Sequence, residues 1–562
     1  MSPDRPDRAA GVSSPEGLDR EVDAVVIGSG PNGLVAANLL ADAGWSVLVL
    51  EEQDTIGGAV ASDSALHPDY VHDTFSSFYP LAAVSPTIRA LELEKHGLVW
   101  SHAPAVLGTP YADGHWAVLH RDRDTTAAAL EQRAQGDGDA WLEMCRTWDA
   151  IGEQVVGALL DPFPPLRAGV GALTRLPRAG GLDFVRTLLA PMREVADQHF
   201  SDDGAKMLLA ANAAHADIPM DGVGSTLMGW LLAMVGQNLG YPVPQGGAGA
   251  FSGAMARRLT SVGGRIVTGC RGEQVVVRDG RAVAVRTSTG EEVRVRQAVV
   301  ADVSAPALYG DLLASEDVPD AVRRRMRQFA WDFGTVKVDW ALSGPVPWQG
   351  APSQAPGTVH VAETIDELAE QSGHILDHLV PARPFLLVGQ MAAADPTRAP
   401  AGAESLWAYT HVPQEVRGDA GASAGTAGIT GKWDHDDVER MADRMQARIE
   451  KYAPGFAERV VARRVLGPRE MQARDANLVG GALNGGTANL HQQLVFRPVP
   501  GLGRAETHVK GLYLGSASAH PGGGVHGACG SNAARAALGH ARLRTAVSVV
   551  RSLPQRVAGG RL

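Results

Sequence analysis

Cysteine is scarce in this sequence, and the positions of the few cysteines exclude several kinds of site. The 562-residue chain contains three, Cys145, Cys270 and Cys529, which are widely separated and form no CxxC pair. We therefore expect no disulfide framework, no zinc cluster and no dithiol redox pair. Such a cysteine content is typical of a reducing compartment.

Long runs of one residue type are also missing. No uninterrupted apolar stretch reaches the roughly 18 to 20 residues that a membrane-spanning helix requires. Basic residues form no long run and the formal net charge is −11, which argues against nucleic acid as a partner. We expect a cytoplasmic protein whose contact with a membrane is at most peripheral.

The composition is that of a folded chain with disordered ends. Apolar residues make up 45% and charged residues 20% of the sequence, as in soluble globular proteins. Its length favours two or more domains. Residues 1–20 are rich in Pro, Asp, Arg, Ser and Gly and are expected to form a disordered tail, and residues 546–562 are expected to form a second tail.

One stretch, residues 22–51, has the pattern of a nucleotide-binding βαβ unit. An apolar strand pattern ends at Ile27, and Gly28-x-Gly30-x-x-Gly33 follows it directly. A helical pattern then runs to Ala43, and a second apolar strand covers residues 47–50. This order and spacing predict a dinucleotide-binding crossover.

Each glycine of this unit has a physical role. Gly28 permits the tight turn, Gly30 lets the backbone approach a pyrophosphate, and Gly33 lets the helix pack against the strand. The helix N-terminus offers free N–H groups to phosphates. Glu51 can accept hydrogen bonds from a ribose 2′-OH and would repel a 2′-phosphate. The unit alone does not distinguish FAD from NAD, and a glycine-rich loop that binds nothing is the alternative.

The rest of the chain shows further patterns. Residues 123–240 are mainly helical in periodicity, and residues 222–239 are apolar on nearly every face, as in a helix that is buried or lines an apolar cavity. His67, His72 and Asp73 are candidate catalytic residues, with structural roles as the alternative. Near the end, a strand over residues 512–514 leads into a glycine-rich loop and a helix that is expected to start near Val525.

Four stretches together resemble the phytoene desaturase family of FAD proteins. Within it they are most similar to the ketolase-type carotenoid enzymes and to the family of pyridine nucleotide-disulfide oxidoreductase domain-containing protein 2. The stretches are GSGPNGLVAANLLADAGWSVLVLE with IGGA, LELEKHGL, PQGGAGAFSGAMA with GGRIV, and HQQLVFRPVPG with GLYL and AHPGGGVHGACGSNAA.

The resemblance implies an α/β fold. It consists of a Rossmann-like FAD-binding domain of the amine-oxidase/glutathione-reductase-like type, a discontinuous α+β substrate domain and a helical cap. The implied FAD-binding parts are residues 21–122, 241–330 and 501–545; the helical cap is 123–240, and the substrate part is 331–500.

The resemblance also implies the cofactor FAD and the residues that bind it. These are Gly28, Gly30, Pro31, Asn32, Gly33, Glu51, Glu52, Gly57, Gly58, Ala59, Gly272, Gly515, Ser516, Gly523, Gly524 and Val525. Ala59 and Ser516 depart from the family pattern, which has arginine and glycine there. Arg497 matches the stretch that approaches flavin and substrate, and His526, with a pKa near neutral, is a candidate base or proton relay.

These implications lead to one preferred function and several alternatives. The preferred function is dehydrogenation of a lipophilic, isoprenoid-type substrate by hydride transfer to FAD, with oxygen or a quinone as acceptor. The alternatives are a ketolase or isomerase, a non-catalytic scaffold, and an amine oxidase; no metal is expected.

Overall fold

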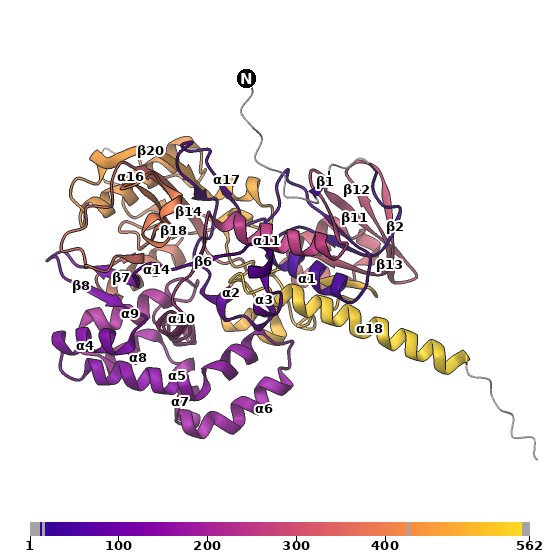
Figure 1. Ribbon diagram of the computed structural model, residues 1–562, viewed down its shortest axis with the longest axis horizontal. Helices are drawn as coiled ribbons and strands as arrows, with labels where there is room; N and C mark the ends of the chain where they lie inside the picture. The colour runs from indigo at the N-terminus through magenta and orange to yellow at the C-terminus, as the bar shows by residue number, and fades with distance from the viewer. Residues whose placement is uncertain (1–11, 14–16, 424–426, 553–562) are drawn as a thin grey trace, which may run out of the picture.

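The first sheet is assembled from strands that lie far apart in the sequence. The computed structural model describes residues 12–13, 17–423 and 427–552. It contains two large sheets side by side, with a group of helices below one of them (Figure 1). The first sheet has the order β1 (Val12–Ser13), β10 (Arg265–Val267), β3 (Val47–Leu50), β2 (Glu21–Ile27), β13 (Glu292–Ala301), β12 (Arg281–Thr287) and β11 (Gly272–Arg278), and β21 (Leu512–Leu514) also pairs with β13.

The predicted βαβ unit is confirmed. Strands β2 and β3 pair in parallel on either side of the crossover helix α1 (Pro31–Asp42). The central strands of this sheet are buried along nearly their whole length, which explains their continuous apolar sequence. The last residues of β13 pair in parallel with β2 and β21, so the glycine turn after β2 and the glycine-rich loop after β21 meet at one end of one sheet.

Helices cover both faces of this sheet. On one face, α1 packs against α11 (Ala248–Ser261) and α18 (Ala528–Ser552), around a core that includes Leu34, Phe251 and Ala533. On the other face, the segment that follows β13 packs against the sheet through residues such as Leu308 and Phe329.

The predicted tails need correction. Val12 and Ser13, assigned to the disordered tail 1–20, form strand β1 because the edge of β10 offers them free backbone groups. Helix α18 runs to Ser552, so the first part of the predicted tail 546–562 is helical. Residues 1–11, 14–16 and 553–562 lie outside the described residues.

The second sheet has one apolar face and an opposite face that carries many polar side chains among apolar ones. Its order is β20 (Val460–Leu466), β14 (Gly334–Leu342), β18 (Glu404–Val412), β17 (Leu386–Gln390), β15 (Pro356–Val361), β7 (Ala105–Pro110) and β8 (Trp116–Leu119). The apolar face packs against α16 (His435–Glu450). Strands β7 and β8, assigned by sequence to the FAD-binding part 21–122, belong to this second sheet, because β7 pairs with β15.

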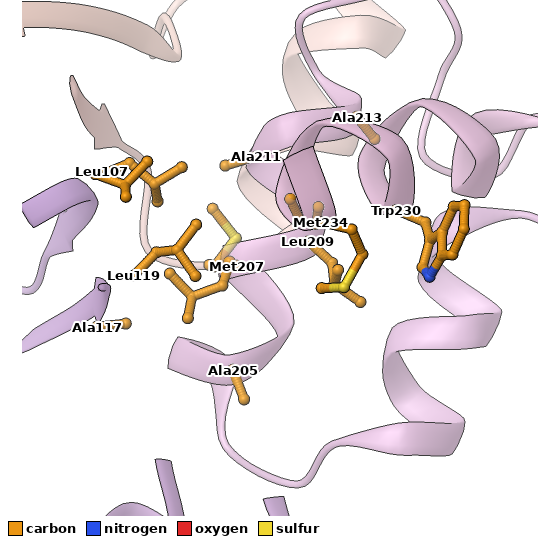
Figure 2. Close-up of a cluster of buried hydrophobic side chains, with 14 of the residues drawn as sticks. Leu107, Ala117, Leu119, Ala205, Met207, Leu209, Ala211, Ala213, Trp230 and Met234 are labelled. Atoms are coloured by element: carbon orange, nitrogen blue, oxygen red, sulfur yellow. The ribbon is translucent and has the colours of Figure 1, made fainter. Parts of the chain in front are cut away.

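The helical cap rests on strands β7 and β8. Its helices are α4 (Arg123–Arg133), α5 (Asp137–Leu160), α6 (Leu166–Arg175), α7 (Leu182–Leu189), α8 (Met192–His199), α9 (Asp203–Ala213) and α10 (Ser225–Leu239). Figure 2 shows Met234 of α10 beside Leu209 of α9, with Trp230 of α10 and Met207 of α9 on either side of this pair. Much of the all-apolar stretch 222–239 is therefore ordinary core.

Shorter elements connect these units. They are α2 (Pro80–Val84), α3 (Pro86–Ala90), α12 (Ala305–Ala307), α13 (Asp320–Met326), α14 (Ile365–Leu376), α15 (Met391–Ala394), α17 (Pro468–Arg474), β4 (Ser62–Asp63), β5 (His72–Asp73), β6 (Trp100–Ser101), β9 (Val243–Pro244), β16 (Leu379–Val380) and β19 (Gly418–Asp419). Among the residues described, none of the helices combines the length and the apolar character needed to span a bilayer.

Candidate functional site

The turn between β2 and α1 has the geometry that its glycines predict. Gly28 has φ +97°, and a Cβ there would lie 2.8 Å from the main-chain oxygen of Asp302. A Cβ at Gly33 would lie 2.2 Å from the carbonyl oxygen of Gly28. Helix α1 starts at Pro31, and its N-cap Gly30 provides no side-chain cap. Part of the helix N-terminus is therefore left for a ligand.

A second glycine loop lies against this turn. The N–H of Gly57 donates to the carbonyl oxygen of Ser29 at 3.1 Å. A Cβ at Gly58 would lie 3.3 Å from the Cα of Gly30. Residues 57–58 therefore lie against the first glycine turn, and Ala59 lines the same cavity as Gly30.

Of the two acids after β3, Glu51 is the one held at the glycine turn. It is buried, and its Oε2 accepts from the N–H and the hydroxyl of Ser29 at 2.8 and 2.6 Å. Its Oε1 accepts from the N–H of Gln53 at 2.9 Å. Glu52 is exposed, with its Oε2 4.0 Å from the Nε of Arg271.

One cavity collects eight of the predicted cofactor residues. They come from the α1 N-terminus, the second glycine loop and the C-terminal loop: Gly30, Pro31, Asn32, Ala59, Ser516, Gly523, Gly524 and Val525. The side-chain Oδ1 of Asn32 is buried and has no hydrogen-bond partner among the described residues. An uncapped helix start, two facing glycine loops and an unpaired acceptor together fit a dinucleotide.

Two buried acids in this cavity were missed by sequence reasoning. Asp302 follows β13 directly, and its Oδ2 accepts from the N–H of Gly33 at 2.7 Å. Burial, with Asp475 nearby, raises the pKa of Asp302 to about 8. Burial also raises the pKa of Asp475 to about 6. The available signal was a polar residue at the carboxyl end of a parallel strand, where such sheets bind ligands.

The C-terminal loop joins the cavity from β21. The N–H of Gly515 donates to the carbonyl oxygen of Ala301 at 2.8 Å, and Ser516 is buried. Val525 has φ +53°, a left-handed conformation that is costly for a β-branched residue and is typical of functional loops. Helix α18 starts at Ala528, so the prediction of a helix start near Val525 is wrong by three residues, and Gly523, Gly524 and Val525 belong to a loop.

The basicity predicted for His526 is wrong. The side chain is buried, and its Nδ1 accepts from the N–H of Ala528 at 3.0 Å. Burial lowers the pKa of His526 to about 4. The imidazole is therefore neutral at pH 7, with one nitrogen already engaged, so a base with a near-neutral pKa is not present here.

Arg497 has a structural position rather than one open to substrate. Its guanidinium is almost completely buried and donates only to main-chain oxygens. The Nε and Nη2 atoms donate to Ala517 at 3.0 and 2.7 Å, Nη2 also to Asn484 at 2.8 Å, and Nη1 to Thr487 at 2.9 Å. Arg497 therefore ties the loop that contains Ser516 to the preceding segment, and the prediction of a catalytic role is replaced by a positioning one.

Gly272 lies near Glu51 but outside the cavity. It starts β11, and a Cβ there would lie 3.2 Å from Cγ2 of Ile27. The preceding N–H of Cys270 donates to the main-chain oxygen of Glu51 at 2.7 Å. Gly272 therefore lies beside the end of β2 and close to Glu51.

The candidate catalytic residues His72 and Asp73 both interact with other protein groups. Asp73 forms a fully buried ion pair with Arg398, with 2.9 Å between Oδ2 and Nη2. The Nε2 of His72 lies 3.2 Å from the main-chain oxygen of Trp340. These contacts join strand β5 to the second sheet and support the structural alternative.

The face of the second sheet that carries polar side chains contains histidines that the sequence did not indicate. The Nε2 atoms of His215 and His360 lie 3.1 Å apart. Burial lowers the pKa of His360 to about 3 and that of His411 to about 4. Among the described residues, no group of these side chains forms a metal site.

Comparisons with known proteins agree with this geometry. The NAD(P)-binding Rossmann-like domain model matches residues 26–91. Pyridine nucleotide-disulfide oxidoreductase domain-containing protein 2 of Rattus norvegicus is 31% identical over 564 residues, spanning 92% of this chain and 93% of that protein. The chain belongs to this family. The family resemblance found in the sequence is thereby confirmed.

More distant relatives place the family in an oxidoreductase superfamily. The phytoene desaturase (neurosporene-forming) of Rhodobacter capsulatus is 25% identical, covering 92% of this chain and 93% of the desaturase. A solved structure of putrescine oxidase bound to putrescine is similar in fold, with a TM-score of 0.58 at 17% identity, over 93% of this chain and 99% of the oxidase chain. The predicted α/β, Rossmann-like fold is therefore confirmed, and the chain has the fold seen in putrescine oxidase.

Proposed function

We propose that this chain is an FAD-dependent oxidoreductase that dehydrogenates a lipophilic, isoprenoid-type substrate. The observation that carries the proposal is the convergence of the glycine turn, the second glycine loop and the C-terminal loop on one cavity. Glu51 favours a nucleotide with a free ribose hydroxyl, since its carboxylate would repel a 2′-phosphate.

The residues for FAD follow from this cavity. Gly28, Gly30 and Gly33 would admit the pyrophosphate, Glu51 would accept from the adenosine ribose, and residues 522–525 would lie along the flavin. Bound FAD would supply the acceptance of a hydride from carbon. Arg497 would fix the C-terminal loop through its contacts to main-chain oxygens, and thus hold the reacting groups in position.

The side of the cavity toward the helical cap supports an apolar substrate. A Cβ at Gly524 would lie 2.7 Å from Cδ1 of Leu81. Leu81 packs against a small apolar cluster of Val156, Leu231 and Val235. Such side chains exclude water from the reacting carbon and bind an apolar chain by burial.

The electron acceptor and the location are part of the same proposal. Oxygen or a quinone would reoxidise the enzyme, which would work in the cytoplasm with peripheral membrane contact. Exposed apolar side chains on α7, Leu182 and Leu189, support such contact, because contiguous exposed apolar groups are typical of interaction surfaces.

Anaerobic spectroscopy tests the reaction class. Phytoene, as the first member of an isoprenoid panel, is added to the FAD-loaded protein without oxygen. The proposal predicts loss of the flavin absorption near 450 nm and formation of a more unsaturated product. A rearranged product with unchanged flavin absorption would make the protein an isomerase. No product from any lipophilic panel member would favour the scaffold instead.

A further inference from the structure

A second cavity lies at the junction of the helical cap and α18. Its volume is about 290 Å³, and it shares no lining residue with the cavity at the glycine loops. Its walls come from the segment after α5, from residues 503–506 and from one side of α18. His520, which also lines it, directly precedes the loop 521–525.

The end of α5 orients two buried polar side chains in this cavity. His520 and Asn532 are 5% and 6% exposed. The Nε2 of His520 lies 3.1 Å from the main-chain oxygen of Asp161, and the Nδ2 of Asn532 donates to that of Leu160 at 3.4 Å. Two consecutive carbonyls thus fix both side chains.

Each of these side chains keeps one unpaired atom, and both atoms are acceptors. A carbonyl oxygen can only accept, so the Nε2 of His520 is the protonated nitrogen. Burial lowers the pKa of His520, so the ring is neutral and its Nδ1 has a free lone pair. The Nδ1 of His520 and the Oδ1 of Asn532 are buried and have no partner in the described chain. A ligand that satisfies both must donate hydrogen bonds.

The side chains that line the cavity indicate which chemical class of hydrogen-bond donor the ligand carries. Arg504, Glu506 and Arg535 line the cavity. Arg504 forms an ion pair with Glu506, with 3.7 Å between Nε and Oε2, whereas the side chain of Arg535 makes no hydrogen bond or ion pair with any residue the structure describes. The net positive charge of these three side chains disfavours an ammonium donor and leaves hydroxyl groups. Phe163 and Leu543 are among the apolar walls, and they favour an aromatic ring over a polyol, whose other hydroxyls would stay unpaired.

We propose that this cavity binds a small hydroxylated aromatic molecule of the phenol or quinol class. Its hydroxyl donates to His520 Nδ1 and Asn532 Oδ1, its ring packs against Phe163, and Arg535 lies near an oxygen at the opposite end of the ring. The proposal needs no bound cofactor and is independent of the reaction proposed for the first cavity.

Fluorine NMR on the full-length protein tests this directly. The probe is 4-fluorophenol, and 4-fluoroanisole is its matched analogue without a hydroxyl donor. We expect the phenol to bind at least tenfold more tightly than the anisole. Equal affinities, or no binding of either probe at millimolar concentration, would overturn the proposal.

Variants on α18 locate the binding site without disturbing the core. Gly539 is exposed, lines the cavity, and an added Cβ would meet nothing within 4 Å. Gly539→Phe should therefore fold, fill the mouth and abolish phenol binding. Arg542→Phe, on the same helix but outside the cavity, is the control and should bind normally. Asn532→Leu should remove most of the preference for phenol over anisole. Unchanged phenol binding by Gly539→Phe would contradict the assignment.

Discussion

Three carboxyl groups surround the glycine turn, and their surroundings differ. Glu51 accepts three hydrogen bonds from Ser29 and Gln53, whereas Asp302 and Asp475 have raised pKa values because they are buried. A diphosphate beside ionised carboxylates would be repelled. Protonation of Asp302 and Asp475 in the folded chain would reduce that repulsion.

Replacing Glu51 tests its proposed role at the ribose. In Glu51→Gln the side chain keeps one acceptor oxygen, so it cannot satisfy Ser29, Gln53 and a ribose hydroxyl together. Hydrogen bonds to a charged group contribute about 1.5–3 kcal/mol, so we expect FAD affinity to fall roughly 10- to 100-fold. Fluorescence titration with FAD measures this. Glu52→Gln, at an exposed neighbour, should bind FAD normally; equal losses in both variants would refute the assignment.

Asp302 gives the protein a predictable pH dependence. Its folded pKa is about 8, above the roughly 3.9 of an unfolded aspartate. The folded state therefore binds the proton more tightly, and this contribution to stability is present at low pH and is lost as pH rises through 8. The free energy of unfolding should decrease between pH 5 and 8.

The variant Asp302→Asn isolates this effect. Asparagine keeps an acceptor for the N–H of Gly33 but does not titrate, so its decrease in stability with pH should be shallower. Urea unfolding at several pH values measures the difference. Asp311→Asn, at an exposed aspartate, is the control, and parallel curves for wild type and Asp302→Asn would contradict the account.

Among individual residues, the sequence predicted those whose position is fixed by the local backbone better than those whose role depends on a titratable side chain. Gly28, Gly33 and Glu51 follow from local spacing, because strand, turn and helix fix their positions. The states of His526 and Arg497 do not follow from local spacing, because they depend on burial and on hydrogen bonds with main-chain groups. Asp302 depends on β13 lying beside β2, a long-range pairing.

At the level of elements, the strongly patterned ones were predictable. Strands β2 and β3 and helix α1 agree with the sequence prediction to within a few residues. The sheet to which β7 and β8 belong was not predicted correctly, because the sequence of a short apolar strand does not specify which sheet it joins. The pairing of β7 with β15 determines the sheet. The sequence of the all-apolar α10 left open whether this helix lies in the core or lines a cavity. Its packing against α9 shows that much of the helix lies in the core (Figure 2).

The proposed membrane contact is assigned to helix α7. Leu182 at its start is 80% exposed, and inserting a leucine into an apolar phase contributes about 1.5–3 kcal/mol. Leu182→Asp should therefore lower binding to phosphatidylglycerol vesicles roughly tenfold or more in a flotation assay. Val262→Asp, at an exposed valine after α11, should float like the wild type. Equal flotation of both variants, or none by the wild type, would rule out α7 as a membrane contact.

At the scale of the whole molecule, the two sheets have separate tasks. The first sheet brings glycine-rich segments from residues 28–33 and 515–525 to one end, and the cap and the second sheet lie beside the first sheet (Figure 1). The glycine-rich family motifs lie in the segments that meet at this end of the sheet. They did not predict the second cavity, which needs the end of α5 and helix α18 in three dimensions.

The most direct test of the account is the identity of the bound chromophore. The purified full-length protein is examined by visible absorption, denatured, and the released compound identified by mass spectrometry. The account predicts flavin bands near 370 and 450 nm and released FAD in about one-to-one ratio to protein. A colourless protein that FAD cannot reconstitute would contradict the account and leave the chain as a scaffold with this fold.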